Sequence, residues 1–352
     1  KPFYFRVARV VRARSGLRMA EHQDSATRAE QDSKEHLDVK ERPAKAAKLA
    51  QRESEPQCTS VKQATEWGAV AADYEALIEP LTGSFVPELL DLVLPNASAG
   101  LAPALPSEPA RGCWDLDSAG MTLLDVACGT GTVAVEAFRR GCKTVAVDVA
   151  PEMARLCAER LGVQLSEQAS APCLNSLLEF PTVRVANAEM LTSTFDEGTF
   201  DAAISNFGII FCDAPSVAVR EMAQCLRPGG TLAISAWGAG AETPAFTVIG
   251  RVAGRLGLPR GQSAVPHPST KRIDGSPASL ERLLQGAGLV DVQVHGPLLR
   301  HLRVSSASAY WERFARGAPG TQTLLAGLNT AEKAELRQAV IDELSQTFQD
   351  EV

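Results

Sequence analysis

Residues 123–131 place one acidic side chain and two glycines at a spacing that suits the binding of a small ligand. The segment is Leu-Leu-Asp-Val-Ala-Cys-Gly-Thr-Gly, in which an apolar run ends near Asp125 and the chain turns through Gly129 and Gly131. Glycine is favoured where the backbone bends sharply or where a ligand lies against the main chain. The pattern predicts a strand, a tight turn and a helix. Helix N-termini at the carboxyl ends of such strands bind ligands in many α/β proteins.

Two classes of cofactor suit this turn. The spacing Gly129-x-Gly131-x-x-Ala134 fits a dinucleotide site. Asp148 follows Gly129 by 19 residues, at the position where a carboxylate binds the ribose in such sites. Asp125 favours a different cofactor, because its carboxylate would repel a pyrophosphate and would attract the cationic amino group of S-adenosylmethionine. The residues therefore favour S-adenosylmethionine and leave a nicotinamide-dependent oxidoreductase as the alternative.

Residues 66–317 resemble the class I S-adenosylmethionine-dependent methyltransferases, in particular the type 11-like group that acts on small molecules. The resemblance rests on five segments in the family's order: LLDVACGTGTVA, VAVDVAPEM, VRVANAEML, GTFDAAISNFGIIF and LRPGGTLAISAW. It implies transfer of a methyl group to an O, N or C atom of a small-molecule acceptor, with release of S-adenosylhomocysteine. A catalytically silent cofactor-binding module is a further alternative.

The resemblance also implies which residues bind the cofactor. The methionine part would lie against Asp125 and the turn, the ribose against Asp148 and the adenine against Asn187. Two positions depart from the family pattern, since Ala127 stands where glycine is commoner and Asn187 where aspartate is usual. An asparagine oxygen can accept from the adenine amino group, and a purely turn-forming role for Asn187 is equally open. The expected cofactor-binding residues are Asp125, Ala127, Gly129, Gly131, Asp148, Asn187, Ala188 and Asn206.

The sequence contains no clear general base. His267 is the weak candidate for a catalytic residue, because it lies in the Gly- and Pro-rich stretch 238–275, where members of the family often shape the acceptor pocket. The sulfonium methyl group is already activated, so alignment of the acceptor can supply much of the acceleration. Proximity and orientation are worth ~7–11 kcal/mol in well-aligned reactions. We expect a largely apolar acceptor pocket.

The elements that must position these residues alternate in type. Short apolar runs at 121–127, 143–149, 183–187, 200–207 and 231–237 are separated by helical patterns. Such alternation predicts a mostly parallel sheet with helices on both faces. Segments 289–294 and 298–304 are expected to pair as a terminal hairpin. The expected fold class is α/β, a Rossmann-like seven-stranded methyltransferase sheet with one terminal antiparallel hairpin strand and helical covers at both ends.

The chain divides into a leader and one domain. Residues 1–20 hold six basic residues and no acid, which is typical of a mitochondrial transit peptide. Residues 21–60 have few large apolar side chains, so 1–60 is predicted to be a disordered or targeting-like leader. Residues 61–352 are predicted to form a methyltransferase domain with an N-terminal helical lid at 61–95, a core at 120–305 and C-terminal helices at 306–352. The expected compartment is the cytoplasm, or the mitochondrion if residues 1–20 are a native transit peptide.

Composition and charge restrict the partners. Residues 1–60 carry 13 Lys and Arg against 9 Asp and Glu, so that of the net charge of −7 the remaining residues 61–352 hold −11. An acidic body argues against DNA, whose phosphates need a basic face. No run approaches the ~18 apolar residues of a membrane-spanning helix, so membrane insertion is not expected. The 8 cysteines and 5 histidines lack the spacing of a zinc site, so no metal is expected.

Overall fold

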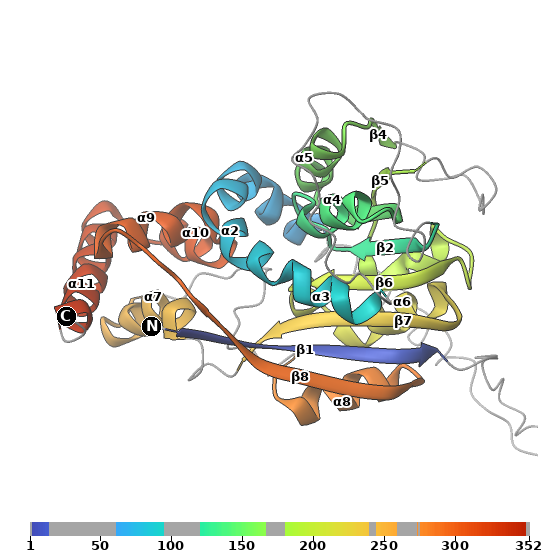
Figure 1. The fold of residues 1–352 in the computed structure, drawn as a ribbon. Helices are drawn as coiled ribbons and strands as arrows, with labels where there is room; N and C mark the ends of the chain where they lie inside the picture. The colour runs from blue at the N-terminus through green and yellow to red at the C-terminus, as the bar shows by residue number, and fades with distance from the viewer. Residues whose placement is uncertain are drawn as a thin grey trace, which may run out of the picture.

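The computed structural model describes residues 2–13, 61–94, 120–166, 180–238, 244–258, 273 and 275–349. The strands of these residues form one eight-stranded sheet in the order β4-β5-β3-β2-β6-β7-β1-β8 (Figure 1). Their bounds are β1 (Pro2–Ala13), β2 (Thr122–Val126), β3 (Lys143–Asp148), β4 (Leu165–Ser166), β5 (Thr182–Val185), β6 (Phe200–Asn206), β7 (Leu226–Trp237) and β8 (Leu289–His301). Strands β2 to β7 pair in parallel, which confirms the predicted Rossmann-like sheet.

Helices cover both faces of this sheet, because each connection between neighbouring parallel strands must cross over one face. The helices α3 (Val86–Val93), α4 (Thr132–Arg139) and α5 (Pro151–Leu161) pack on one face. The helices α6 (Pro215–Cys225) and α8 (Pro277–Gly286) pack on the other. Leu123 and Leu124 are successive residues of β2, yet both are fully buried and belong to different core clusters. Burial on both faces is why this strand is a continuous apolar run in the sequence.

A second group of helices lies at one end of the sheet. Residues 61–77 are helical, and the chain continues through α2 (Glu79–Thr82) and the 3-10 turn η1 (Gly83–Phe85) into α3. The helices α7 (Pro244–Arg255), α9 (Ala307–Gly317), α10 (Pro319–Ala326) and α11 (Thr330–Gln349) join them. Ile78, Val252, Phe314 and Leu336 belong to their shared apolar core. Figure 1 shows α9, α10 and α11 grouped beside α2.

Strand β1 departs from the sequence-based expectations. The leader predicted over residues 1–60 is wrong for residues 2–13, which form β1 antiparallel to both β7 and β8. The arginines in this segment indicated a transit peptide, but they stand among Phe, Tyr and Val, the residue types that are enriched in strands. Segments 289–294 and 298–304 do not pair as a hairpin, because β8 is one continuous strand and β1 is its antiparallel neighbour. The sheet has one strand more than expected, because β1 and the two-residue strand β4 are added while the two hairpin segments are replaced by the single strand β8. Residues 14–60 lie outside the described residues.

Two negative findings concern the described ranges only. None of their helices combines the length and the apolar character needed to cross a membrane. The same ranges contain no group of three or more His, Cys, Asp or Glu side chains placed to hold a metal ion.

Candidate functional site

A cavity of about 180 Å³ lies at the carboxyl ends of the parallel strands. This is the edge of an open α/β sheet at which ligands bind. Its walls come from the turns after β2, β3, β5, β6 and β7, from the helix over 61–77, and from α7, α9 and α10. Six of the eight predicted cofactor residues line it, namely Ala127, Gly129, Asp148, Asn187, Ala188 and Asn206. Asp125 and Gly131 are not part of its lining.

The turn after β2 has the backbone conformation that its glycines indicate. Ala127, Gly129 and Gly131 have φ values of 55°, 55° and 97°, all in the left-handed region. Ala127 therefore occupies a conformation in which glycine is less strained. Gly131 has a packing role as well, because a Cβ atom there would lie 2.6 Å from Sγ of Cys157 in α5. Gly129 thus leaves space at the cavity wall, and Gly131 allows α4 to approach α5.

Asp148 ends β3 and is held in place by backbone amides. Its Oδ2 atom accepts a hydrogen bond from the Gly129 N–H at 2.8 Å, and Oδ1 accepts one from the Ala150 N–H at 2.9 Å. Burial raises the pKa of this carboxyl to about 6, although these hydrogen bonds favour the charged form. The residue is fixed, lines the cavity and has lone pairs left to accept from hydroxyl groups. These properties suit the ribose role that the sequence predicts.

Asp125 lies behind the turn and has no compensating partner. It is 1% exposed, and neither carboxylate oxygen forms a hydrogen bond with the described residues. Burial raises its pKa to about 8, and the nearby backbone N–H of Ala134 only partly opposes this rise. Leaving an ionised carboxylate buried and unpaired is costly. A cationic group bound at the turn would lower that cost, so this orphaned carboxylate fits the amino group of S-adenosylmethionine.

Asn187 has a structural role that limits its binding role. Its Oδ1 atom accepts a hydrogen bond from the Glu189 N–H at 2.9 Å and caps the 3-10 helix η3 (Ala188–Ser193). Of the two roles considered for Asn187, the structure shows the turn-forming one for its Oδ1 atom. Because Asn187 and Ala188 also line the cavity, an adenine contact would use the Asn187 amide nitrogen or the backbone of Ala188.

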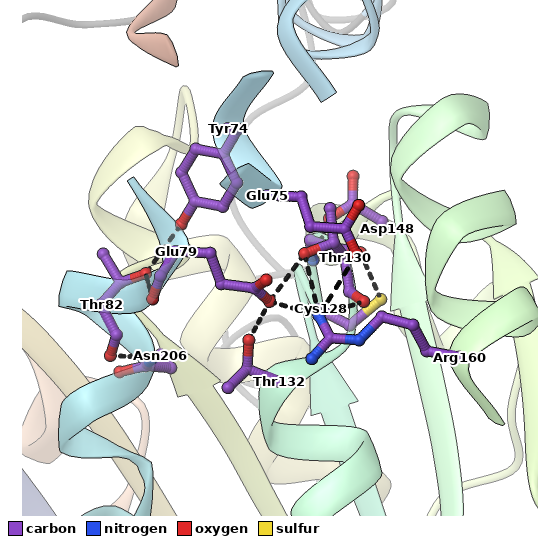
Figure 2. A network of polar contacts seen from close by, with 11 residues as sticks. Tyr74, Glu75, Glu79, Thr82, Cys128, Thr130, Thr132, Asp148, Arg160 and Asn206 are labelled. Atoms are coloured by element: carbon purple, nitrogen blue, oxygen red, sulfur yellow. Dashed lines mark hydrogen bonds and ion pairs between the residues drawn. The ribbon is translucent and has the colours of Figure 1, made fainter. Parts of the chain in front are cut away.

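Asn206 ends β6 and connects the sheet to the N-terminal helices. Its Nδ2 atom donates to the Thr82 carbonyl at 3.1 Å, and its Oδ1 atom accepts from Ser235 Oγ at 2.8 Å. Thr82 is also 3.2 Å from the Tyr74 hydroxyl through its own Oγ1 atom. Figure 2 shows this chain of contacts beside the turn. Asn206 therefore shapes the cavity wall. His267, the candidate for a catalytic residue, lies outside the described residues.

Several functional candidates have no signal in the sequence. Glu79 of α2 reaches the two threonines that flank Gly131, across more than fifty residues of chain (Figure 2). Gln63 donates to Asp213 at 3.0 Å, which joins the helix over 61–77 to the loop after β6. An acid at a helix start and a glutamine on a polar helix face are common surface features. Only their tertiary neighbours show that they belong to the site.

Aromatic side chains form two walls of the cavity. On one wall Trp67 makes edge contacts with Tyr74 and Phe211, at centroid distances of 5.7 and 5.1 Å. On the other, Phe207 and Trp237 stack at 3.9 Å with an interplanar angle of 15°. Phe246 and Phe314 extend this second wall. Among the described residues no Lys, Arg or His lines the cavity.

Comparisons with known proteins agree with this geometry. The methyltransferase-domain family matches residues 124–234. The ubiquinone biosynthesis O-methyltransferase of Xanthomonas axonopodis pv. citri is 32% identical over 187 residues, which span 52% of this chain and 68% of that protein. An uncharacterized protein of Mycobacterium tuberculosis, Rv1405c, is 30% identical over 123 residues, which span 34% of this chain and only 38% of the relative.

Two solved structures match part of this chain at low sequence identity. The YcgJ protein from Bacillus subtilis is 18% identical with a TM-score of 0.39, over 60% of this chain and 79% of that one. A Thermotoga maritima S-adenosylmethionine-dependent methyltransferase, described as a possible histamine N-methyltransferase, is 22% identical with a TM-score of 0.31. It matches 48% of this chain and 63% of its own length.

Proposed function

The chain belongs to the S-adenosylmethionine-dependent methyltransferase family, and we propose that its acceptor is a small, uncharged aromatic molecule. Family membership supports methyl transfer over the oxidoreductase alternative that the same Gly-x-Gly spacing leaves open. The compound that accepts the methyl group and the product released belong to the proposal. The observation that carries it is the aromatic lining of the cavity at the carboxyl ends of β6 and β7, where Phe207 and Trp237 lie.

The residues of the turn and of β3 would hold the cofactor. Asp148 would accept hydrogen bonds from the ribose hydroxyls, and the buried Asp125 would favour the cationic amino group electrostatically. The glycines give the methionine part access to the main chain, and Asn187 and Ala188 border the adenine end. When bound, S-adenosylmethionine supplies a methyl group on a positively charged sulfur. The chain's own contribution is to bind and orient it beside the acceptor.

The acceptor end of the cavity favours a flat ring without negative charge. Its walls are mainly aromatic, and aromatic pairs add about 0.5–1.5 kcal/mol beyond the burial of their area. The carboxylates of Asp148, Glu189 and Asp213 also line the cavity, and an anion there would meet repulsion with no described cation to offset it. A phenol-like hydroxyl is the preferred acceptor atom, in line with the O-methyltransferase name of the Xanthomonas relative. Methyl transfer to a nitrogen or carbon atom of the acceptor is an alternative outcome that activity assays would reveal.

Calorimetric titration tests the cofactor part of the proposal. The protein should bind S-adenosylmethionine and S-adenosylhomocysteine at ~100 μM or below, since productive sites commonly work in the micromolar to millimolar range. Absence of heat for both compounds would exclude the proposed function. Binding without methyl transfer to any acceptor would support the catalytically silent alternative instead.

Two probes with the same ring test the acceptor part. At neutral pH 2-naphthol is uncharged and 2-naphthoate is an anion. In the presence of S-adenosylhomocysteine, 2-naphthol should bind about 10-fold more tightly than 2-naphthoate. Repulsion of about 1.4 kcal/mol between the naphthoate anion and the acidic side chains of the cavity corresponds to this factor of ten. Replacing Trp237 by Ala should weaken 2-naphthol about 5-fold or more through the loss of ring contact, while Trp237→Phe retains most of the affinity. Equal affinity for the two probes would contradict an uncharged acceptor.

A further inference from the structure

One buried carboxylate joins the N-terminal helices to the Gly-rich turn. Glu79 begins α2 and is 8% exposed. Its Oε1 atom accepts hydrogen bonds from the hydroxyl groups of Thr130, at 2.7 Å, and Thr132. Arg160, at the end of α5, donates through Nη1 to the same oxygen at 2.6 Å. Three donors from two elements therefore converge on one carboxylate oxygen, as Figure 2 shows.

The threonines that Glu79 contacts determine the shape of the turn. Thr130 and Thr132 flank Gly131, and Gly129 precedes them, so two left-handed glycines lie within or beside the clamped segment. Glycine has more backbone freedom to lose than any other residue, so such a turn needs external contacts to hold one conformation. Arg160 adds a contact from the far side, since Nη1 also donates to the Thr130 carbonyl at 3.0 Å.

The short helix α2 links this clamp to the cavity. Thr82, at its last position, contacts the Tyr74 hydroxyl and accepts from Asn206, and all three residues line the cavity. The chain packs closely against the turn at the end of α2, because a Cβ atom on Gly83 would lie 2.8 Å from Cγ2 of Thr132. Glu79 itself is not part of the cavity lining, so it acts through the turn.

We propose that Glu79 is a positioning residue that holds the Gly-rich turn in its cofactor-binding shape and fixes the position of the N-terminal helices that line the acceptor cavity. The proposal rests on the proposed function only in taking S-adenosylmethionine as the ligand of the turn. Loss of Glu79 weakens the cofactor and raises the acceptor KM, while kcat at saturation changes little, because no Glu79 atom faces the reacting groups.

Titration of S-adenosylhomocysteine into matched variants is the first measurement. Glu79→Ala should raise the Kd about 10-fold or more, because it removes hydrogen bonds to a charged group. Glu79→Gln keeps an acceptor oxygen and should raise it about 2- to 5-fold. Glu75→Gln is the control on the neighbouring helical turn, since Glu75 is 3.9 Å from Arg160 and its side chain is 37% exposed. Its Kd should stay within about 2-fold of the wild-type value, as expected for an exposed ion pair.

A double-mutant cycle separates positioning from general destabilisation. Thr132→Val removes one hydroxyl that donates to Glu79, and Glu79→Ala removes its acceptor, so the two changes should be clearly non-additive in the Kd. The KM of the acceptor should rise in the same variants, with kcat within about 2-fold of wild type, the split expected when positioning and not chemistry is changed. If Glu79→Ala does not fold, the two conservative variants carry the test.

Hydrogen exchange of the ligand-free protein gives a readout that needs no cofactor. Amides of residues 128–132 should exchange faster in Glu79→Gln than in wild type, with core strands unchanged. Unchanged exchange and an unchanged Kd in both Glu79 variants would overturn the positioning role. A wild-type protein that binds no cofactor would overturn the proposed function, and the exchange result would still decide the role of Glu79.

Discussion

Asp125 makes the ligand-free protein sensitive to pH. Burial raises its pKa to about 8 in the folded state from an ordinary value of 3.8. A raised carboxyl pKa favours the folded state when the group is protonated, so this contribution is complete below about pH 4 and is lost as the pH rises through 8. Thermal stability without ligand should therefore fall between pH 7 and 9, a window in which Asp148, with a pKa of about 6, is already mostly ionised.

The variant Asp125→Asn removes this titration. Its melting temperature should change at least ~2 °C less than that of wild type between pH 7 and 9, the shift that accompanies a difference of about 1 kcal/mol. Cofactor affinity should show the opposite trend, since the cationic amino group favours the ionised carboxylate. In wild type it should rise toward pH 8, by up to about 10-fold per pH unit, and in the variant it should be weaker and flat. Parallel melting curves of the two proteins across this range would contradict an unpaired Asp125.

Local motifs predict where single residues lie when their position depends on neighbours in sequence. That Asp148 and Gly129 line the cavity was predictable, because a short segment of sequence contains both the end of a strand and a glycine turn. Asn187 was predictable only as an alternative, since one side chain can cap a turn and border a ligand. Glu79 was not predictable, because its partners Thr130 and Arg160 are brought to it by the tertiary fold.

At the scale of elements, Gly131 controls how closely two helices approach. Gly131→Ala would place a methyl group 2.6 Å from Cys157 Sγ at a residue with φ of 97°. We expect a loss of about 2–5 kcal/mol, from left-handed strain of about 1–2 kcal/mol and overpacking of about 1–3 kcal/mol. Urea denaturation measures it. Adding Cys157→Ala should recover part of the loss, because the sulfur that clashes is removed.

Gly162 provides the matched control for this prediction. It has φ of 71° at the end of α5, with no atom within 4 Å of a Cβ placed there. Gly162→Ala should therefore show the strain alone, about 1–2 kcal/mol. Equal losses in Gly131→Ala and Gly162→Ala would show that the contact with Cys157 has no energetic effect.

The pattern of elements was predictable in the centre of the sheet and not at its edge. Strands β2, β3 and β6 are buried on both faces, so they appear as apolar runs between helices. The edge depends on which distant segment pairs with β7, and no local pattern encodes that choice. Segments 289–294 and 298–304 were expected to form a hairpin, whereas both belong to the region of β8 (Leu289–His301), which is one strand and pairs with β1.

At the scale of the whole molecule, β1 connects distant parts of the chain, because it pairs with both β7 and β8. Deleting residues 2–13 would leave β7 and β8 without their shared neighbour. Unpaired strand edges promote association, so the shortened protein should aggregate and melt at least ~10 °C lower, given ~2–4 °C for each kcal/mol in a domain of this size. Differential scanning calorimetry and light scattering measure both effects. A monodisperse protein with an unchanged melting temperature would show that β1 does not belong to the sheet.

The position of β1 also sets an order of events during synthesis. Pro2 pairs with His301, and Ala13 with Leu289, so the earliest of the described strands completes its pairing only after the last of them has been made. Contacts this distant along the chain slow folding, and a partly made chain exposes an unfinished sheet edge. Production of this enzyme should therefore benefit from slow translation or abundant chaperones more than an enzyme whose sheet is completed by neighbouring strands.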